Sequence, residues 1–189
     1  ISKTVDDAAG EAFDKAASIL GLGWPGGPLI DQAAQHGEAI HALPRPKKIS
    51  DGTYHFSFSG LKTALLYGVC GHPTRIDGEV TFPRSASELS QQAKHDWAAS
   101  FQLAAVDTLE NGLIHALTMH NNIRCIVAGG GVLANSLLRN RLEALAKSHH
   151  ISTHVPDMTY CVDNAAMIAG LGFPLFRDGH RDSLEVMAS

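Results

Sequence analysis

The stretch IRCIVAGGGVLANSLLRNRLEALAK, residues 123–147, joins an apolar run, three glycines and a helical pattern. Ile123–Val127 is rich in β-branched residues, which is typical of a buried strand in a parallel sheet. The three glycines, Gly129–Gly131, end that run. Apolar residues at helical spacing follow, namely Leu133, Leu137, Leu138, Leu142 and Leu145. The stretch therefore predicts a strand, a glycine turn and an amphipathic helix.

Such a turn suits a nucleotide. Glycine lets the backbone approach a ligand closely, and the unpaired N–H groups of a first helical turn favour an anion. We expect Asn135 in that first turn, where its amide can both donate and accept. A plain β–α connection that binds nothing fits equally well, because this stretch contains neither Gly-x-x-x-x-Gly-Lys nor Gly-x-Gly-x-x-Gly.

Composition excludes some classes of protein. A chain of 189 residues that is 44% hydrophobic and 18% charged is ordinary for one globular domain with its own core. Proteins that cover nucleic acid are usually basic, whereas the net charge here is −4, so any RNA contact must come from a local patch. The odd number of cysteines, three, argues against a disulfide framework and for a reducing compartment, the cytoplasm.

No run of about 18 apolar residues occurs, so we expect no membrane span. The chain begins at Ile1 instead of Met, from which we expect that an N-terminal part of a longer protein precedes it. Periodicity and turn signals predict helices at 6–20, 29–36, from Gly60 and at 85–120 and 163–176, and strands at 54–59 and 151–155.

Particular residues should begin or interrupt these elements. Thr4, Asp6 and Asp7 suit the start of the first helix as cap and dipole partners. The capping box Ser85-x-x-Glu88 should open the long helix, and Asn111-Gly112 is a candidate interruption of it. The segment 71–84, with Pro, Gly and mixed polarity, predicts a loop.

Two acidic groups could carry chemistry. Asp7, Glu11 and Asp14 are three or four residues apart and would share a helix face, where ribose hydroxyls or a metal would relieve their repulsion. A solvated acidic helix start is the alternative that composition favours. Asp163, at the expected start of the last helix, is either a cap or a single oxygen ligand. One Asp alone does not hold a transition metal, because imidazoles are the usual companions.

The eleven histidines supply no obvious pair. His149 and His150 are adjacent, His115 and His120 are five residues apart, and His-Glu-x-x-His does not occur. The default interpretation of each histidine is therefore a surface or core residue.

Five motifs in a fixed order are more specific than any one of them. They are DDAAGEAFDK (6–15), PGGP (25–28), FSFSGLKTA (56–64), VAGGGVLAN (127–135) and CVDNAAMIA (161–169). In this order they resemble the tRNA N6-adenosine threonylcarbamoyltransferase family, formerly described as O-sialoglycoprotein endopeptidases. The resemblance runs from about Ile1 to Phe176.

The resemblance implies an α/β fold of the actin/hexokinase-like ATPase type, of which this chain is the C-terminal half, helix-rich with a partial, mainly parallel sheet. Residues 1–177 would form the lobe with the nucleotide and metal sites, including a helical insertion at about 29–120. Residues 178–189 would be a tail. The N-terminal lobe, with its His-x-x-x-His motif, would be absent from this chain.

The resemblance also implies site residues. Those expected to bind the adenylate substrate are Asp14, Gly27, Asp31 and Asn135. Asp163 would complete a metal site with the two absent histidines, and Lys62 would face the tRNA or the cleft. Val162 stands where the family commonly has Thr, which removes a hydroxyl beside the metal position.

The implied activity is transfer of the threonylcarbamoyl group from threonylcarbamoyl-adenylate to N6 of adenosine 37 in tRNAs that read ANN codons. The implied cofactors are one divalent metal ion, iron or zinc, and an adenylate or ATP-type nucleotide as the substrate moiety. The implied partners are tRNA, a paralogous subunit and an ATPase. The sequence offers no persuasive side-chain nucleophile and does not identify a general base, and we expect the 189-residue chain alone to be inactive.

Three alternatives differ in class. A non-catalytic paralogue of the same fold would tend to lose Asp14 and Asp163, which are present here. A sugar or acid kinase of the same fold would need phosphotransfer motifs that this segment does not show, and fold alone does not decide function. A metalloprotease is disfavoured by the missing His-Glu-x-x-His, and an assay with and without a chelator would test it.

Overall fold

The computed structural model describes residues 3–45, 47–50, 52–76 and 78–183. Ile1 and the part of the expected tail beyond residue 183 lie outside the described residues. The α-helices are α1 (Ala9–Leu20), α2 (Gly26–Ala34), α3 (Ser59–Cys70), α4 (Gln91–Met119), α5 (Ser136–Ser148) and α6 (Ala165–Arg177). The short 3-10 helices are η1 (Ala86–Glu88), η2 (Gly131–Ala134) and η3 (Met158–Tyr160).

Among the described residues, the strands are short and form three small sheets. They are β1 (Lys3–Thr4), β2 (Lys47–Ser50), β3 (Thr53–Phe56), β4 (Thr74–Ile76), β5 (Glu79–Thr81), β6 (Cys125–Val127) and β7 (Ser152–His154). The first sheet has the order β1-β3-β2, with β1 parallel and β2 antiparallel to β3. β6 and β7 pair in parallel, and β4 and β5 pair antiparallel. The fold is thus helix-rich with small sheets, but only two of these four pairings are parallel.

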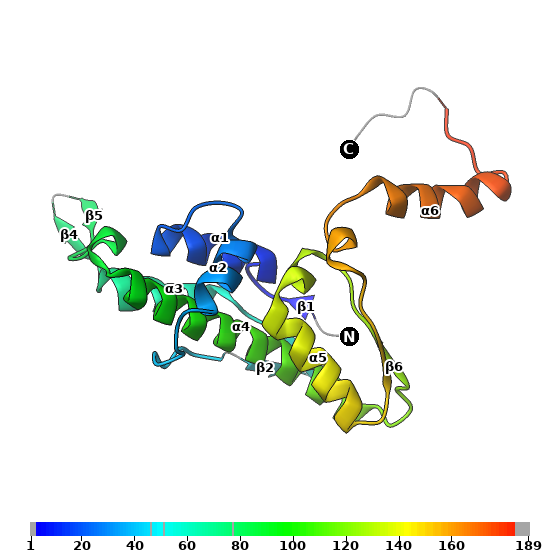
Figure 1. Ribbon diagram of the computed structural model, residues 1–189, viewed down its shortest axis with the longest axis horizontal. Helices are drawn as coiled ribbons and strands as arrows, with labels where there is room; N and C mark the ends of the chain where they lie inside the picture. The colour runs from blue at the N-terminus through cyan, green and yellow to red at the C-terminus, as the bar shows by residue number, and fades with distance from the viewer. Residues whose placement is uncertain (1–2, 46, 51, 77, 184–189) are drawn as a thin grey trace.

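Helix α4 is the axis of the described fold, with α1, α2 and α3 packed on it and α5 crossing its C-terminal part (Figure 1). The main core lies among the first four helices, and its largest fully buried side chains are Leu20, Ile30, Phe58, Leu61, Leu65, Val69 and Phe101. A second core joins α4 to the glycine turn and α5 through Val106, Leu133, Leu138, Leu142 and Cys161. Val132, directly after the three glycines, packs against both cores.

Helix α4 is continuous, so the expected interruption at Asn111-Gly112 is wrong. Gly112 is instead a packing position, where a Cβ atom would lie 2.6 Å from Phe56 Cζ and 3.1 Å from Tyr54 Cδ1. Strand β3 lies directly against α4 at this point. Gly112 therefore lets β3 approach α4 closely without interrupting the helix.

The segment 71–84 is not only a loop, because it contains the hairpin β4–β5, with Gly78 at φ 87° in its turn. The capping box is present, but it opens η1 instead of the long helix. Helix α4 begins at Gln91, where the Ser90 side chain accepts the N–H of Ala93 at 3.1 Å. The expected range 29–120, proposed as a helical insertion, thus holds four strands as well as helices.

Strand β6 is less buried than expected. Only Ile126 is buried, and Val127 is 79% exposed. Within the described part of the chain, β6 pairs with β7 alone, so one edge and part of one face have no neighbour. The last helix, α6, is apolar yet has no buried residue, and in Figure 1 it extends away from the other helices. No helix among the described residues is both long enough and apolar enough to cross a bilayer.

The residues expected to cap α1 do not do so. Its N-cap is Ala8, with no side-chain cap bond. The carboxylate of Asp6 instead accepts the N–H groups of Phe58 at 2.7 Å and Ser59 at 3.2 Å, at the start of α3. It also accepts the hydroxyls of Ser57 and Ser59. Asp6 therefore caps a helix that follows it by about fifty residues.

The pKa of Asp6 reflects this arrangement. Burial raises the pKa, but the hydrogen bonds from Ser57, Phe58 and Ser59 outweigh it and lower the pKa from 3.8 to about 2.

Asp6→Ala is therefore expected to destabilise the protein by about 1 kcal/mol at neutral pH, as loss of a helix cap does. A carboxyl with a lowered pKa stabilises the fold only while ionised, so the difference should shrink as pH falls from about 4 toward 2.

Urea unfolding of both proteins across this pH range measures the effect. The exposed acid Glu79, in the hairpin β4–β5, provides a control variant, Glu79→Ala, expected to be neutral within about 0.5 kcal/mol. A stability difference between the natural protein and Asp6→Ala that stays constant from neutral pH down to about 2 would contradict the capping role of the ionised carboxylate.

Candidate functional site

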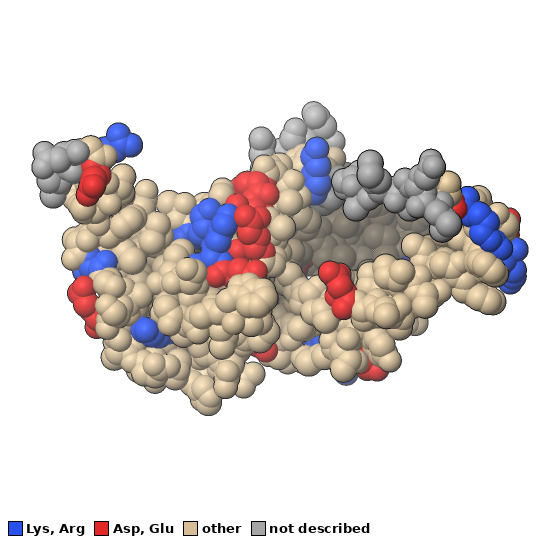
Figure 2. Space-filling view, turned by 90° about the horizontal axis from the view of Figure 1, so that it is seen from above, with Lys and Arg blue, Asp and Glu red and all other residues tan. Residues whose placement is uncertain are grey.

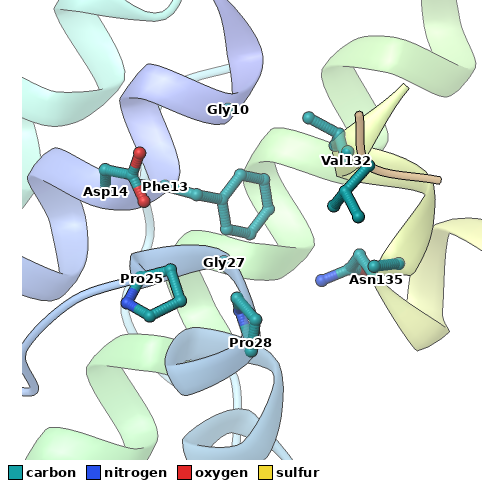
Figure 3. Close-up of a pocket in the computed structure, with 11 residues that line it drawn as sticks. Gly10, Phe13, Asp14, Pro25, Gly27, Pro28, Val132 and Asn135 are labelled. Carbon is teal, nitrogen blue, oxygen red and sulfur yellow. The ribbon is translucent and has the colours of Figure 1, made fainter. Parts of the chain in front are cut away.

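A cavity of about 360 Å³ lies where α1, α2 and the glycine turn meet. Figure 3 shows side chains from these three elements turned toward one space. Its lining residues are Gly10, Phe13, Asp14, Pro25, Gly27, Pro28, Gly131, Val132, Ala134, Asn135 and Val162. Most of the lining is apolar, with few polar groups, as in many small-molecule sites. Three of the expected substrate-binding residues, Asp14, Gly27 and Asn135, are thus brought together.

Helices α1 and α2 hold the first wall. The Oδ1 atom of Asp14 accepts the N–H of Gly26 at 2.7 Å, which satisfies one of the unpaired donors at the start of α2. Its second oxygen, Oδ2, accepts no hydrogen bond from the residues that the structure describes. Gly27 follows in the same helical turn, and a Cβ atom there would meet nothing within 4 Å. The cavity therefore has an open glycine and one available carboxylate oxygen on this side.

Asn135 lies on the opposite wall, but not in the first turn of a helix as expected. It is the N-cap of α5, and its Oδ1 accepts the N–H of Leu138 at 3.0 Å. Its Nδ2 donates to Oε1 of Gln102 in α4 at 2.8 Å. The residue is only 6% exposed. Asn135 lines the cavity while its amide holds α5 against α4, and its contact with substrate stays a prediction.

A second cavity, of about 490 Å³, adjoins the first, and Gly131 and Val162 line both. Its walls are the glycine turn, Gly129–Gly131, on one side and the stretch Tyr160–Asp163 together with Met167 of α6 on the other. Asp163 is exposed here and precedes the helix instead of lying in its first turn. The N-cap of α6 is Asn164, whose side chain accepts the N–H of Met167 at 3.0 Å.

The metal position can be tested against the donor atoms around Asp163. Within residues 3–183, apart from the three undescribed positions, no group of three His, Cys, Asp or Glu side chains could hold an ion. One exposed carboxylate does not define the four-coordinate geometry that zinc usually takes. The described residues alone therefore do not make the metal centre that Asp163 was expected to complete.

Asp31 does not line either cavity. Its carboxylate accepts the hydroxyl of Ser136 at 2.8 Å and the N–H of Ser136 at 3.3 Å. Ser136 is the first residue of α5, so this bond joins α2 to the helix that follows the glycine turn. The structure thus gives Asp31 a contact that holds α2 against the start of α5. Its direct contact with substrate stays a prediction.

Two acidic side chains at the start of α1 form ion pairs with lysines. Asp7 precedes the helix and pairs with Lys15 and Lys62, each at 2.9 Å, while Glu11 pairs with Lys15 at 2.7 Å. The hydrogen bonds from Lys15 and Lys62 lower the pKa of Asp7, and those to Glu11 and Asp7 raise the pKa of Lys15. The expected repulsion is thus relieved by lysines of the same chain.

Lys62, expected to face the tRNA or the cleft, is half-buried beside Asp7 and lines neither cavity. On the face shown in Figure 2, Lys and Arg side chains form separate groups, some of them beside acidic side chains. This face therefore carries no broad basic surface, in agreement with the net charge of −4.

Two side chains that line the first cavity were not predicted from the sequence to be site residues. Phe13 belongs to the buried apolar face of α1 and packs edge-to-face on Phe101 at 5.4 Å between ring centroids. Val132 lies in η2, directly after the glycines. Both residues serve the core and the cavity wall, and nothing in the spacing of apolar residues separates these two roles.

The order of motifs and the geometry agree with a comparison to known families. The sequence profile of the tRNA N6-adenosine threonylcarbamoyltransferases matches residues 1–170. The chain belongs to this family. A curated relative from Thermosipho africanus, named tRNA N6-adenosine threonylcarbamoyltransferase, is 45% identical over 95% of this chain and 49% of its own length.

Relatives of the same name give similar values. One from Dehalococcoides mccartyi is 44% identical over 98% of this chain and 50% of its own length. One from Caldicellulosiruptor saccharolyticus is 45% identical over 92% of this chain and 47% of its own length. The chain spans about half the length of the curated relatives it matches.

Both cavities lie within the matched range, since their lining residues run from Gly10 to Met167. The site is therefore built from the part of the chain that the threonylcarbamoyltransferase family shares. The region beyond residue 170, which includes most of the exposed apolar residues of α6, contributes nothing to either cavity.

Proposed function

We propose that the natural protein transfers a threonylcarbamoyl group from threonylcarbamoyl-adenylate to N6 of adenosine 37 in tRNAs that read ANN codons. This chain would be the C-terminal lobe of an actin/hexokinase-like ATPase fold. The observation that supports the proposal most is the cavity that unites Asp14, Gly27 and Asn135 beside the glycine turn, in a chain of the threonylcarbamoyltransferase family.

The reaction is an acyl transfer to an amine. The N6 lone pair forms a bond to the carbamoyl carbon, and the bond from that carbon to the phosphate oxygen breaks. AMP leaves with the electron pair, and the amine gives up a proton. The residues of this chain would act by binding and orienting the donor. Correct positioning of the reacting groups removes a large part of the activation barrier in such reactions.

Each wall suits one part of the adenylate. The apolar side chains of Phe13, Pro28 and Val132 offer a surface for the adenine ring. The free Oδ2 of Asp14 can accept a ribose hydroxyl, while Oδ1 stays bound to Gly26. The backbone of Gly129–Gly131, next to the second cavity, lets phosphate oxygens approach without a side chain in the way. The proposed adenylate would thus extend from the first cavity toward the second.

The remaining components are proposals of the same kind. Asp163 would give one carboxylate oxygen to an iron or zinc ion, whose other ligands the described residues do not supply. Lys62 would face the tRNA or the cleft, with Asp7 as its partner in this structure. A paralogous subunit and an ATPase would assemble with the natural protein in the cytoplasm.

Asp14→Asn tests the nucleotide site. The amide keeps an oxygen for the N–H of Gly26, so the fold should be retained, but the negative charge that binds a ribose hydroxyl is lost. By calorimetry we expect the Asp14→Asn variant to bind AMP about five- to thirtyfold more weakly than the natural protein does, a loss of about 1–2 kcal/mol. The control is Glu11→Gln, an exposed acid on the same helix that lines neither cavity.

The control variant should bind AMP as the natural protein does, because exposed ion pairs contribute little. Unchanged AMP affinity in Asp14→Asn would remove this carboxylate from the nucleotide site. Unfolding of Asp14→Asn would show that its bond to Gly26 depends on the charge and that the residue is structural.

A further inference from the structure

Arg139, the fourth residue of α5, joins this helix to η2 and to the segment 156–163 through its guanidinium group. Its Nε donates to the backbone oxygen of Leu133 at 2.5 Å, in η2 directly after the glycines. Its Nη2 donates to the backbone oxygen of Pro156 at 2.6 Å and to Sγ of Cys161 at 3.0 Å. The planar guanidinium suits this task, because its donors point in fixed, divergent directions.

These partners belong to, or adjoin, the two walls of the second cavity, because Cys161 lines it and Leu133 lies two residues after Gly131. Leu133 belongs to η2, which contains Gly131, and Cys161 lies two residues before Asp163. Among the residues that the structure describes, two donate hydrogen bonds to the segment 156–163 from outside it, Arg139 and Asn164. Asn164 is the next residue in the chain and binds the backbone oxygen of Val162 at 2.9 Å, so Arg139 provides the hydrogen bonds that come from elsewhere in the fold. The burial of Cys161, 3% exposed, against Leu133 and Leu142 is the other attachment of this segment.

We infer that Arg139 is a positioning residue that fixes the segment 156–163, and with it Val162 and Asp163, at a set distance from the glycine turn. Because Val162 lines both cavities, this bridge determines the width of the space between them. Without it, the segment would be held to α5 by one small side chain, Cys161. The consequence for the substrate, though not the bridge itself, rests on the proposed function.

Arg139→Gln, Arg139→Lys and Arg141→Gln in the natural protein form a matched set. Gln removes the charge and most of the donors, whereas Lys keeps a cation that can reach one backbone oxygen. Arg141 lies on the same helix and pairs with Asp107 and Glu110, away from both cavities. It therefore controls for the loss of an arginine from α5.

The first readout does not depend on any nucleotide. Alkylation of the three free cysteines by N-ethylmaleimide, located by peptide mass spectrometry, reports on the segment through Cys161 and on the rest of the fold through Cys70 and Cys125. We expect Arg139→Gln to raise the rate at Cys161 at least tenfold and leave the other two rates unchanged. Arg139→Lys should give a smaller rise, and Arg141→Gln none.

The second readout is the affinity for AMP. We expect Arg139→Gln to weaken AMP binding at least fivefold, Arg139→Lys to recover part of this loss, and Arg141→Gln to bind normally. An unchanged rate at Cys161 in Arg139→Gln would overturn the inference. Equal exposure of all three cysteines would overturn it as well, because Arg139 would then support the whole fold.

The two readouts separate the inference from the proposed function. A faster reaction at Cys161 with unchanged AMP affinity would show that the segment moves without shaping the site, which overturns the inference and leaves the proposed function standing. If the natural protein itself does not bind AMP, the proposed nucleotide site fails, and the rate at Cys161 still decides whether Arg139 holds the segment.

Discussion

Gly26→Ala is expected to destabilise the protein by about 3 kcal/mol, the upper part of the range for overpacking, and to abolish nucleotide binding. A Cβ atom at Gly26 would overlap the Cα atom of Asp14 and lie 2.7 Å from the backbone oxygen of Phe13. Its distance to the Cβ atom of Ala17 would be 2.9 Å. Backbone atoms cannot rotate away, so α1 and α2 would have to separate. That separation would also lengthen the bond from Gly26 to Asp14, at the wall of the first cavity.

The neighbouring glycine provides the matched control. Gly27 occupies the same helical turn, yet a Cβ atom there would meet nothing within 4 Å. Gly27→Ala should therefore keep the stability or raise it by up to about 1 kcal/mol, because alanine favours a helix. Its methyl group would occupy space at the edge of the cavity, so we expect weaker AMP binding in a stable protein. Urea unfolding and calorimetry on both variants separate packing from ligand contact.

Equal stability of Gly26→Ala and Gly27→Ala would contradict the close contact between α1 and α2. A stable Gly27→Ala that binds AMP normally would instead place the nucleotide away from this end of the cavity. The pair of variants thus tests the fold and the site with the same substitution at adjacent positions.

Local signals explain why several elements could be predicted. Helix α1 has apolar residues at regular spacing and ends at Gly21, whose φ of 66° is the left-handed conformation that glycine adopts easily. Strands β6 and β7 and helix α5 were found in the same way, from short β-branched runs and an amphipathic pattern. In each case the residue pattern within the element was enough to predict it, although β6 and β7 also depend on their pairing with each other.

The features that sequence reasoning missed depend on distant contacts. Asp6 suited the start of α1, but it caps α3, because the sheet pairing of β1 with β3 brings these segments together. Gly112 suggested an interruption because a glycine within a helix is usually a weak point. Its contact with Phe56 makes it a packing residue, and no local pattern indicates that contact.

The residues of the candidate site also differ in how far the sequence could predict them. Asp14, Gly27 and Asn135 were chosen because their motifs resemble a family, and the fold brings all three to one cavity. Asp31 was chosen by the same route, but the fold directs its carboxylate to Ser136. Arg139 was not predicted to have a role in the site, because an arginine in an amphipathic helix usually faces solvent. Its role depends on a segment that returns beside α5 about twenty residues later.

Asn135→Ala is expected to lower the stability by about 2–4 kcal/mol, which combines the loss of a helix cap with a buried acceptor left unpaired. The cap bond to the N–H of Leu138 would disappear, and so would the donor that Oε1 of Gln102 receives. Both partners are buried, so water cannot readily replace the amide. Loss of AMP binding in this variant alone would therefore not identify a ligand contact.

Asn135→Asp distinguishes the two roles of this residue. A carboxylate can still accept the N–H of Leu138, and a negative charge is favourable at the start of a helix. The side-chain amide of Gln102 can turn to donate its Nε2 to the new oxygen. We therefore expect urea unfolding to show that this variant keeps its stability within about 1 kcal/mol of the natural protein.

The same carboxylate would lie at the wall of the first cavity, close to where the adenylate phosphate is proposed to pass, and would repel it. AMP should then bind about tenfold more weakly to a protein of nearly unchanged stability, which corresponds to about 1.4 kcal/mol. If Asn135→Asp is stable and binds AMP normally, the phosphate lies elsewhere and Asn135 acts only as a cap. If Asn135→Ala keeps full stability, the bonds to Leu138 and Gln102 do not support the fold, and the residue is free to serve the substrate.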